Sequence, residues 1–372
     1  MPFEWSKVGI GPAADEFEVT VFGPGFGECL VIHVGNGRWV IVDSCVDASD
    51  RTDTRPVAEK YLRKIGVDLK NQVDLIVASH WHDDHVRGLS RLVEICPMAT
   101  FSCANALLQD EFLTFVESMA TGSAATNGAK VKEIRQVLNL ATDPSRPAIR
   151  FANGGRLIRA WPSLEGVEIN ALSPSDREYQ IFLSAIGNLL PQQGQAKRAA
   201  SRQTPNLASV VLHVKSPIFS VLLGADMEIH HDPSRGWTAA IQEANNKGLS
   251  KSCIFKVAHH GSQNGHHDQL WAELLTYKPI SIITPYSRLP ANKKLPTVTD
   301  LARISSLSSR TFSTAQISSS SIKGRSTGIV RGLRDSGIIT RSLASTIGMV
   351  RLRKSPLKTE WDIDIISPAL EH

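Results

Sequence analysis

The sequence lacks the features that direct a chain into a membrane or a secretory pathway. No apolar run approaches the roughly 20 residues that a helix needs to span a bilayer, so we expect no membrane-spanning segment and no membrane partner. The N-terminal residues Met-Pro-Phe-Glu-Trp contain neither a basic segment nor an apolar stretch, so no signal peptide is predicted. The chain has no internal repeat and no heptad pattern either.

Cysteine is also scarce. The five cysteines are odd in number, widely separated and never arranged as a CxxC pair, which argues against a disulfide framework and for a reducing, cytoplasmic location. We expect at least four of them to be small, buried hydrophobic residues. They are Cys29, Cys45, Cys96, Cys103 and Cys253.

The composition is that of a globular protein, but its charge is unevenly placed. Hydrophobic residues make up 42% of the 372 positions, which suffices for one large domain or two ordinary ones. Residues 291–369 carry 13 Lys and Arg against 5 Asp and Glu, whereas residues 1–290 carry 28 against 30. Such a basic segment favours an anionic substrate or partner, although a solvated basic surface has the same composition. Residues 370–372 are typical of an expression-tag remnant, and no part in the fold is predicted for them.

The hydrophobic pattern predicts alternating strands and helices. Strands are predicted at 17–22, 28–34, 38–42, 73–78, 99–103, 149–160, 167–172, 208–215, 218–223, 252–258 and 280–283. Helices are predicted at 54–65, 86–95 and 235–247, and in an insertion over about 104–140 that is interrupted by a small-residue loop around 121–128. Beyond residue 290 we predict a Ser-rich, β-rich extension with strands at 328–330, 338–340, 348–352 and 361–366.

Four metal-binding side chains follow directly after the predicted strand at 73–78. They are His80, His82, Asp84 and His85, in the spacing His-x-His-x-Asp-His. Imidazole and carboxylate are ligands that zinc prefers, and the strand end provides a fixed base for the loop that carries them. The spacing therefore predicts a metal site, and the alternative is a surface loop that happens to be rich in histidine.

Further acidic and histidine residues stand at the ends of other predicted strands. Asp43 follows the strand at 38–42, and Asp226 follows the strand at 218–223, although Asp226 could instead cap the next helix. His259-His260-Gly261-Ser262 comes at the end of the strand at 252–258.

The histidine loop and the order of the elements resemble the metallo-β-lactamase superfamily. The resemblance covers most of residues 17–290 and rests on the histidine loop, on Gly-x-Asp at 224–226 and on His-His-Gly-Ser at 259–262. It implies an α/β fold, the αββα sandwich, for a catalytic domain at 1–290. The extension at 291–369 then completes this fold or is appended to it. The resemblance also implies two divalent ions, with zinc the first choice and manganese the alternative.

Roles for single residues follow from this resemblance. His80 and His82 are expected to hold one ion, Asp84, His85 and His259 the second, and Asp226 to bridge the two. Asp43 is expected to orient a ligand histidine. Asp84 is also expected to accept a proton, and His260 to lie on the substrate side or in packing. His267, in the pair His266-His267, is either an exposed loop residue or a catalytic residue for substrate binding or proton transfer.

A narrower branch of the superfamily includes the metallohydrolase domain of the DNA-uptake channel of competent bacteria. This branch is similar to the chain in Leu-Gly-Ala-Asp-Met-Glu at 223–228 and in Lys-Val-Ala-His-His-Gly-Ser at 256–262. Two features depart from the pattern. Many dinuclear members have a further ligand histidine before Asp226, but here only His213 is available. It lies inside an alternating strand, so we expect a packed or exposed strand histidine rather than a ligand. Leu295-Pro296 stands where the branch often has a histidine before a proline.

The branch implies a phosphodiesterase or nuclease, with a nucleic acid or nucleotide as the anionic substrate. The basic extension favours this function because it would attract a polyanion. The alternatives are a lactonase or β-lactamase-like hydrolase of a small ester or amide, and a binding module without catalysis.

Overall fold

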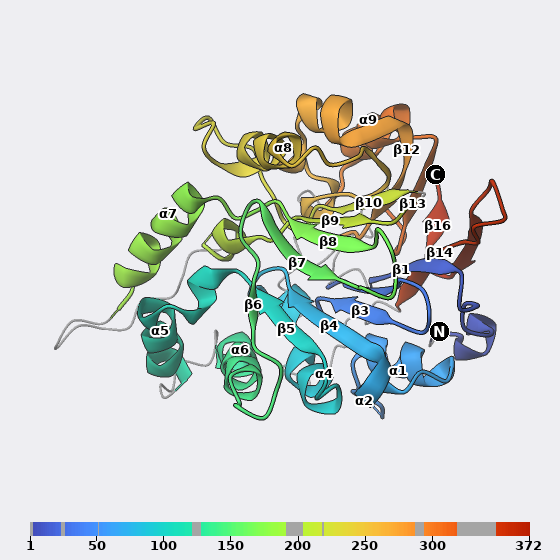
Figure 1. The fold of residues 1–372 in the computed structure, drawn as a ribbon. Helices are drawn as coiled ribbons and strands as arrows, with labels where there is room; N and C mark the ends of the chain where they lie inside the picture. The colour runs from blue at the N-terminus through green and yellow to red at the C-terminus, as the bar shows by residue number, and fades with distance from the viewer. Residues whose placement is uncertain are drawn as a thin grey trace, which may run out of the picture.

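Two eight-stranded β-sheets pack face to face, and helices cover the outer face of each sheet (Figure 1). The computed structural model describes residues 3–23, 27–50, 52–120, 128–190, 204–217, 219–286, 294–317 and 347–372. The four layers confirm the predicted αββα sandwich. None of the described helices is both long enough and apolar enough to cross a bilayer.

The first sheet has the strand order β15-β14-β1-β2-β3-β4-β5-β6. Its strands in chain order are β1 (Phe17–Gly23), β2 (Cys29–His33), β3 (Trp39–Val42), β4 (Val73–Ala78), β5 (Thr100–Cys103), β6 (Arg150–Phe151), β14 (Gly348–Lys354) and β15 (Asp362–Ile366). Every residue of β4 is buried, because both faces of this strand are covered. The strands β3 to β6 run parallel, so the loops that follow them leave from the same edge of the sheet.

The second sheet has the order β16-β13-β12-β11-β10-β9-β8-β7. Its strands are β7 (Arg156–Ala160), β8 (Glu168–Ala171), β9 (Leu212–Lys215), β10 (Ser220–Leu223), β11 (Ser252–Lys256), β12 (Leu275–Ile283), β13 (Arg310–Ser313) and β16 (Leu370–Glu371). The strands β10 to β13 are parallel, and their carboxyl ends also share one edge. The predicted strand at 149–160 is in fact two strands, β6 and β7, which belong to different sheets.

The helices fall into two outer layers. They are α1 (Val57–Lys64), α2 (Leu69–Gln72), α3 (Asp83–Val86), α4 (Leu89–Ile95), α5 (Asp110–Ala120), α6 (Gly128–Ala141), α7 (Asp176–Gly187), α8 (Gly236–Asn246) and α9 (Val298–Leu307). In Figure 1, α1, α2, α4 and α6 lie below the first sheet, and α8 and α9 lie above the second. The sequence pattern did not predict α7 or α9, although both begin with a capping box.

The helical insertion packs against the histidine loop through aromatic side chains. Trp81 lies in that loop, and its ring centroid is 5.1 Å from Phe112 and 5.9 Å from Phe115, both in α5. Phe112 also contacts Phe182 of α7, with ring centroids 5.6 Å apart. All but the last residue of the predicted loop around 121–128 lies outside the described residues.

The C-terminal part of the chain contributes strands to both sheets. β14 pairs with β1 along its whole length and carries β15 on its other side, while β13 pairs with β12. The strands predicted at 348–352 and 361–366 correspond to β14 and β15, and those predicted at 328–330 and 338–340 lie outside the described residues. The sequence predicts no part in the fold for residues 370–372, but Leu370 and Glu371 form β16. The carboxylate of Glu371 accepts a hydrogen bond of 2.6 Å from Arg310 Nε.

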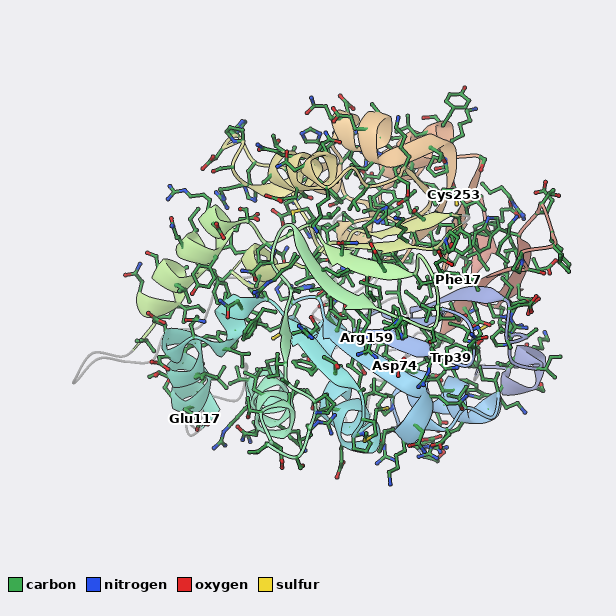
Figure 2. All side chains as sticks on the ribbon, in the orientation of Figure 1. Phe17, Trp39, Asp74, Glu117, Arg159 and Cys253 are labelled. Atoms are coloured by element: carbon green, nitrogen blue, oxygen red, sulfur yellow. The ribbon has the colours of Figure 1, made fainter. Side chains whose placement is uncertain are left out.

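Polar groups inside the sandwich tie distant parts of the chain together. The buried carboxylate of Glu18 in β1 accepts hydrogen bonds from Tyr61 Oη at 2.5 Å and from Arg353 Nε at 2.6 Å, which joins β1, α1 and β14. At another edge, Asp74 of β4 lies 3.8 Å from Arg159 Nη2 of β7, so an ion pair links the two sheets there (Figure 2). The five cysteines are free thiols, four of them buried as predicted.

Candidate metal centre

The histidine loop lies where the parallel strands of the first sheet end. β4 stops at Ala78, and the backbone then turns into the short helix α3, so that His80 and His85 are fully buried. Asp84 is 7% exposed, and His82 is only partly buried. His80 Nε2 and His82 Nδ1 are 3.1 Å apart, so the two rings present nitrogen atoms to a common point.

Asp226 comes to the same place from the second sheet. It follows β10, and its side chain is buried between the histidines. Its Oδ2 atom lies 3.6 Å from His80 Nε2, while its Oδ1 atom lies 3.6 Å from His85 Nε2 and 3.8 Å from His260 Nε2. The two oxygens of one carboxylate therefore face two different sets of histidines.

Two groups of side chains at this place could each hold a divalent ion. The described residues contain the group His80, His82 and Asp226 and the group Asp84, His85 and His260. In the second group, Asp84 Oδ2 lies 3.4 Å from His260 Nε2 and 3.7 Å from His85 Nε2. Tetrahedral zinc with ligands at about 2.1 Å requires ligand atoms roughly 3.4 Å apart. The spacing of the second group therefore fits a zinc ion.

Two buried polar atoms support the same conclusion. Neither His85 Nε2 nor Asp226 Oδ1 has a hydrogen-bond partner among the described residues, although both atoms are inaccessible to water. A buried polar atom without a partner destabilises a folded protein. A cation between these atoms would satisfy both, so the residues present fit a divalent metal.

The structure places His260, and not the predicted His259, in the group with Asp84 and His85. The sequence predicts His259 as the ligand, but His260 is the histidine that lies against Asp84 and Asp226. Both residues have left-handed backbones, with φ of 46° and 54°, and this turn directs the His260 ring into the site. His259 instead places Nδ1 3.2 Å from Glu228 Oε1. His260 Nδ1 donates to the carbonyl of Thr284 at 2.8 Å, which leaves Nε2 for a metal.

Asp43 lies where its predicted orienting role requires. Its Oδ2 atom accepts a hydrogen bond of 2.7 Å from His85 Nδ1, so Nδ1 keeps its proton and Nε2 is the ring atom directed at the site. The carboxylate also accepts hydrogen bonds from the Ser79 backbone N–H at 2.7 Å and from the Ser79 hydroxyl at 2.6 Å. Asp43 thereby holds the start of the histidine loop and its last histidine together.

The carboxylates of the site attract positive charge. Burial alone would lower the pKa of His85, but four surrounding carboxylates outweigh burial and raise that pKa to about 10. In decreasing order of effect they are Glu28, Asp84, Asp43 and Asp226. His80 differs, because burial and the neighbouring His85 hold its pKa well below the usual range. A metal ion would displace the proton of His85, so binding is expected to release protons.

A buried ion pair beneath the site was missed by the sequence analysis. Glu28, directly before β2, forms a salt bridge with Lys256, at the end of β11, and each side chain is 1% exposed. Glu28 also joins Asp43 and His85 in a third group with metal-ligand spacing, but the Lys256 ammonium already supplies a cation there. The sequence did contain a signal for this ion pair. Glu28 is a charge beside the apolar strand that begins at 29, and Lys256 is a charge within the apolar strand at 252–258.

Two other predicted histidines lie apart from the metal groups. His267, predicted as catalytic, places Nε2 3.3 Å from the Thr238 hydroxyl and lines a separate cavity of about 810 Å³ with His230 and Arg303. His213 is buried in β9 and its Nε2 lies 2.8 Å from the Ser250 carbonyl, so of the two expected alternatives, packed or exposed, it is the packed one.

Comparisons with known proteins find one family model and several solved structures that are similar to this chain. Residues 22–110 match the family model described as the metallo-beta-lactamase superfamily. No curated protein matches the sequence. Among solved structures, the metallo-beta-lactamase fold protein YhfI from Bacillus subtilis is 11% identical, with 80% of this chain and 95% of that chain covered and a TM-score of 0.41. The metallo-beta-lactamase SMB-1 bound to 2-mercaptoethanesulfonate is 15% identical over 73% of this chain and 88% of that chain, with a TM-score of 0.35.

Proposed function

We propose that this chain, whose residues 22–110 match the metallo-β-lactamase superfamily, is a metal-dependent hydrolase that cleaves phosphodiester bonds. The observation that carries the proposal is the position of Asp226. One of its oxygens faces His80, and the other faces His85 and His260. A carboxylate in this position suits a centre of two divalent ions, and the imidazole and carboxylate donors suit zinc, with manganese as the alternative.

Divalent ions at such a centre lower the pKa of a water molecule and neutralise charge on a phosphoryl oxygen. The protein holds the centre rigid through Asp43, which fixes His85, and through the Thr284 carbonyl, which fixes His260. Asp84 is suited to accept the proton that the attacking water loses, because its carboxylate lies between His85 and His260. His82 is the most exposed member of the first group, so the substrate is expected to approach on that side.

The phosphodiester is favoured by the charge of the C-terminal segment. Within the described residues, several basic side chains of this segment are paired with acids, for example Arg351 with Asp364 and Lys358 with Asp362. The sequence at 318–346, outside the described residues, adds five Lys and Arg against one Asp. This excess of positive charge in the sequence supports an anionic substrate such as a nucleic acid or a nucleotide.

The test is a hydrolysis screen with zinc and with manganese. We expect cleavage of bis(p-nitrophenyl) phosphate, a cyclic nucleotide, or single-stranded DNA or RNA, with loss of activity to background in His80→Ala and Asp226→Ala. Asp143→Ala, which changes an exposed aspartate outside the metal-ligand groups, should keep full activity. Intact phosphodiesters together with hydrolysis of a lactone or β-lactam would replace this proposal with the neutral-substrate alternative.

A further inference from the structure

We propose that Glu28, Lys256 and Thr284 form a positioning unit that holds the two halves of the metal centre together and sets its metal affinity. The inference rests on the proposed function, because it assumes that Asp84, His85 and His260 hold an ion. None of the three residues belongs to that ligand group. Their effect is therefore exerted through the ligands.

The three residues meet between the two sheets. Glu28 precedes β2 of the first sheet, whereas Lys256 ends β11 and Thr284 follows β12 of the second. The Glu28 carboxylate pairs with the Lys256 ammonium and accepts a hydrogen bond of 2.6 Å from the Thr284 hydroxyl. Thr284 is 1% exposed, so water does not compete for these contacts.

The unit contacts ligands from both sheets. On the side of the first sheet, the backbone N–H of Glu28 donates to the Asp84 carbonyl at 3.0 Å, and Glu28 Oε1 lies 3.8 Å from His85 Nδ1. On the side of the second sheet, the Thr284 carbonyl accepts the hydrogen bond from His260 Nδ1 at 2.8 Å. A change in the Glu28–Thr284 contact would therefore alter the distance between His85 and His260.

The energetics favour a positioning role over a stabilising one. Desolvation of two charges costs several kcal/mol per ion, and a buried pair often contributes no more stability than apolar residues of similar volume. The contribution of this pair is therefore expected in the geometry of the site. Groups that orient metal ligands typically account for a factor of about 10 to 100 in metal affinity.

The test measures zinc affinity in variants of the full chain by competition with a chromophoric chelator. Thr284→Val removes the hydroxyl that reaches Glu28 and keeps the carbonyl that holds His260, so we expect one of two zinc ions to bind about 10 to 100 times more weakly. Thr284→Ser retains a hydroxyl and should restore most of the affinity. Lys256→Met should weaken the binding of the same ion. If Lys256→Met does not fold, Thr284→Val alone tests the positioning role.

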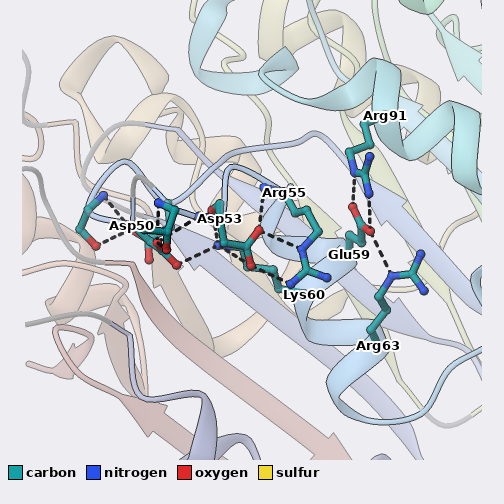
Figure 3. A network of polar contacts seen from close by, with 10 residues as sticks. Asp50, Asp53, Arg55, Glu59, Lys60, Arg63 and Arg91 are labelled. Atoms are coloured by element: carbon teal, nitrogen blue, oxygen red, sulfur yellow. Dashed lines mark hydrogen bonds and ion pairs between the residues drawn. The ribbon is translucent and has the colours of Figure 1, made fainter.

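A matched control removes a buried carboxylate away from the metal centre. Glu59 of α1 is 1% exposed and pairs with Arg63 at 3.0 Å and with Arg91 at 2.5 Å (Figure 3). Glu59→Gln should lower the melting temperature and leave zinc affinity unchanged. Circular dichroism and thermal melts of all variants separate a loss of fold from a loss of metal.

The outcomes distinguish the two proposals. Thr284→Val protein that folds and binds two zinc ions as tightly as the wild type overturns the positioning role, and so does a variant with a lower melting temperature but unchanged zinc affinity. If the wild type binds two zinc ions but cleaves no phosphodiester, the proposed function fails, and weakened binding in Thr284→Val still supports the positioning unit. Wild-type protein that binds neither zinc nor manganese overturns both.

Discussion

Phe112 joins the helical insertion to the histidine loop, and its removal should destabilise both. The side chain is fully buried in α5 and contacts Trp81 of the loop and Phe182 of α7. Phe112→Ala removes a large buried ring and leaves a cavity, which costs about 3–5 kcal/mol in similar cores. The aromatic contacts contribute about 0.5–1.5 kcal/mol for each pair. The cavity value already contains part of the aromatic contribution, so we expect the free energy of unfolding to fall by about 4 kcal/mol.

Urea denaturation followed by tryptophan fluorescence measures this loss as a lower midpoint at an unchanged slope. Trp81 lies between His80 and His82, so Phe112→Ala should also weaken zinc binding in the protein that remains folded. Tyr277→Ala is the control, because that ring is 91% exposed and its removal should change stability by no more than about 0.5 kcal/mol. A loss below about 1 kcal/mol in Phe112→Ala would refute the packing of the insertion beneath the loop.

Two further results should follow from the charges of the structure. Burial raises the pKa of Glu59, but Arg91 and Arg63 outweigh burial and hold that pKa below the usual carboxyl range. The ion pairs of Glu59 therefore stabilise the fold above about pH 4.3, and this stability is lost as the pH falls through the lowered pKa. Melting temperatures of wild type and Glu59→Gln should therefore converge in acid, and a constant difference from pH 7 to pH 3 would contradict the assignment. Zinc at 100 times its dissociation constant should raise the free energy of unfolding of the wild type by about 2.7 kcal/mol. The increase should be smaller in His85→Ala. Equal increases in a calorimetric melt would exclude His85 as a ligand.

The sequence was sufficient to predict the histidine loop because all its members follow one apolar strand. His80, His82, Asp84 and His85 are fixed by local chain geometry, and the structure brings them together. Asp226 was also predicted, since it follows a strand of the second sheet, and the ends of parallel strands share an edge.

The remaining features depend on tertiary structure. His260 rather than His259 faces Asp84 because both residues adopt a left-handed backbone, which is uncommon outside glycine, so a strand pattern could not reveal it. Glu28 and Lys256 pair across the two sheets and are separated by more than 200 positions in the sequence. The helices α7 and α9 were missed for another reason, because the capping boxes at Ser175 and Thr297 could have been read locally.

The position of β14 beside β1 has a consequence for how the protein is made. β1 leaves the ribosome early, but one of its two hydrogen-bonding neighbours is formed by residues 348–354, so its edge stays open during nearly all of translation. Open strand edges pair readily with other chains. The newly synthesised protein is therefore exposed to aggregation until its final strands are added, and the yield of folded protein should depend on how quickly those strands dock.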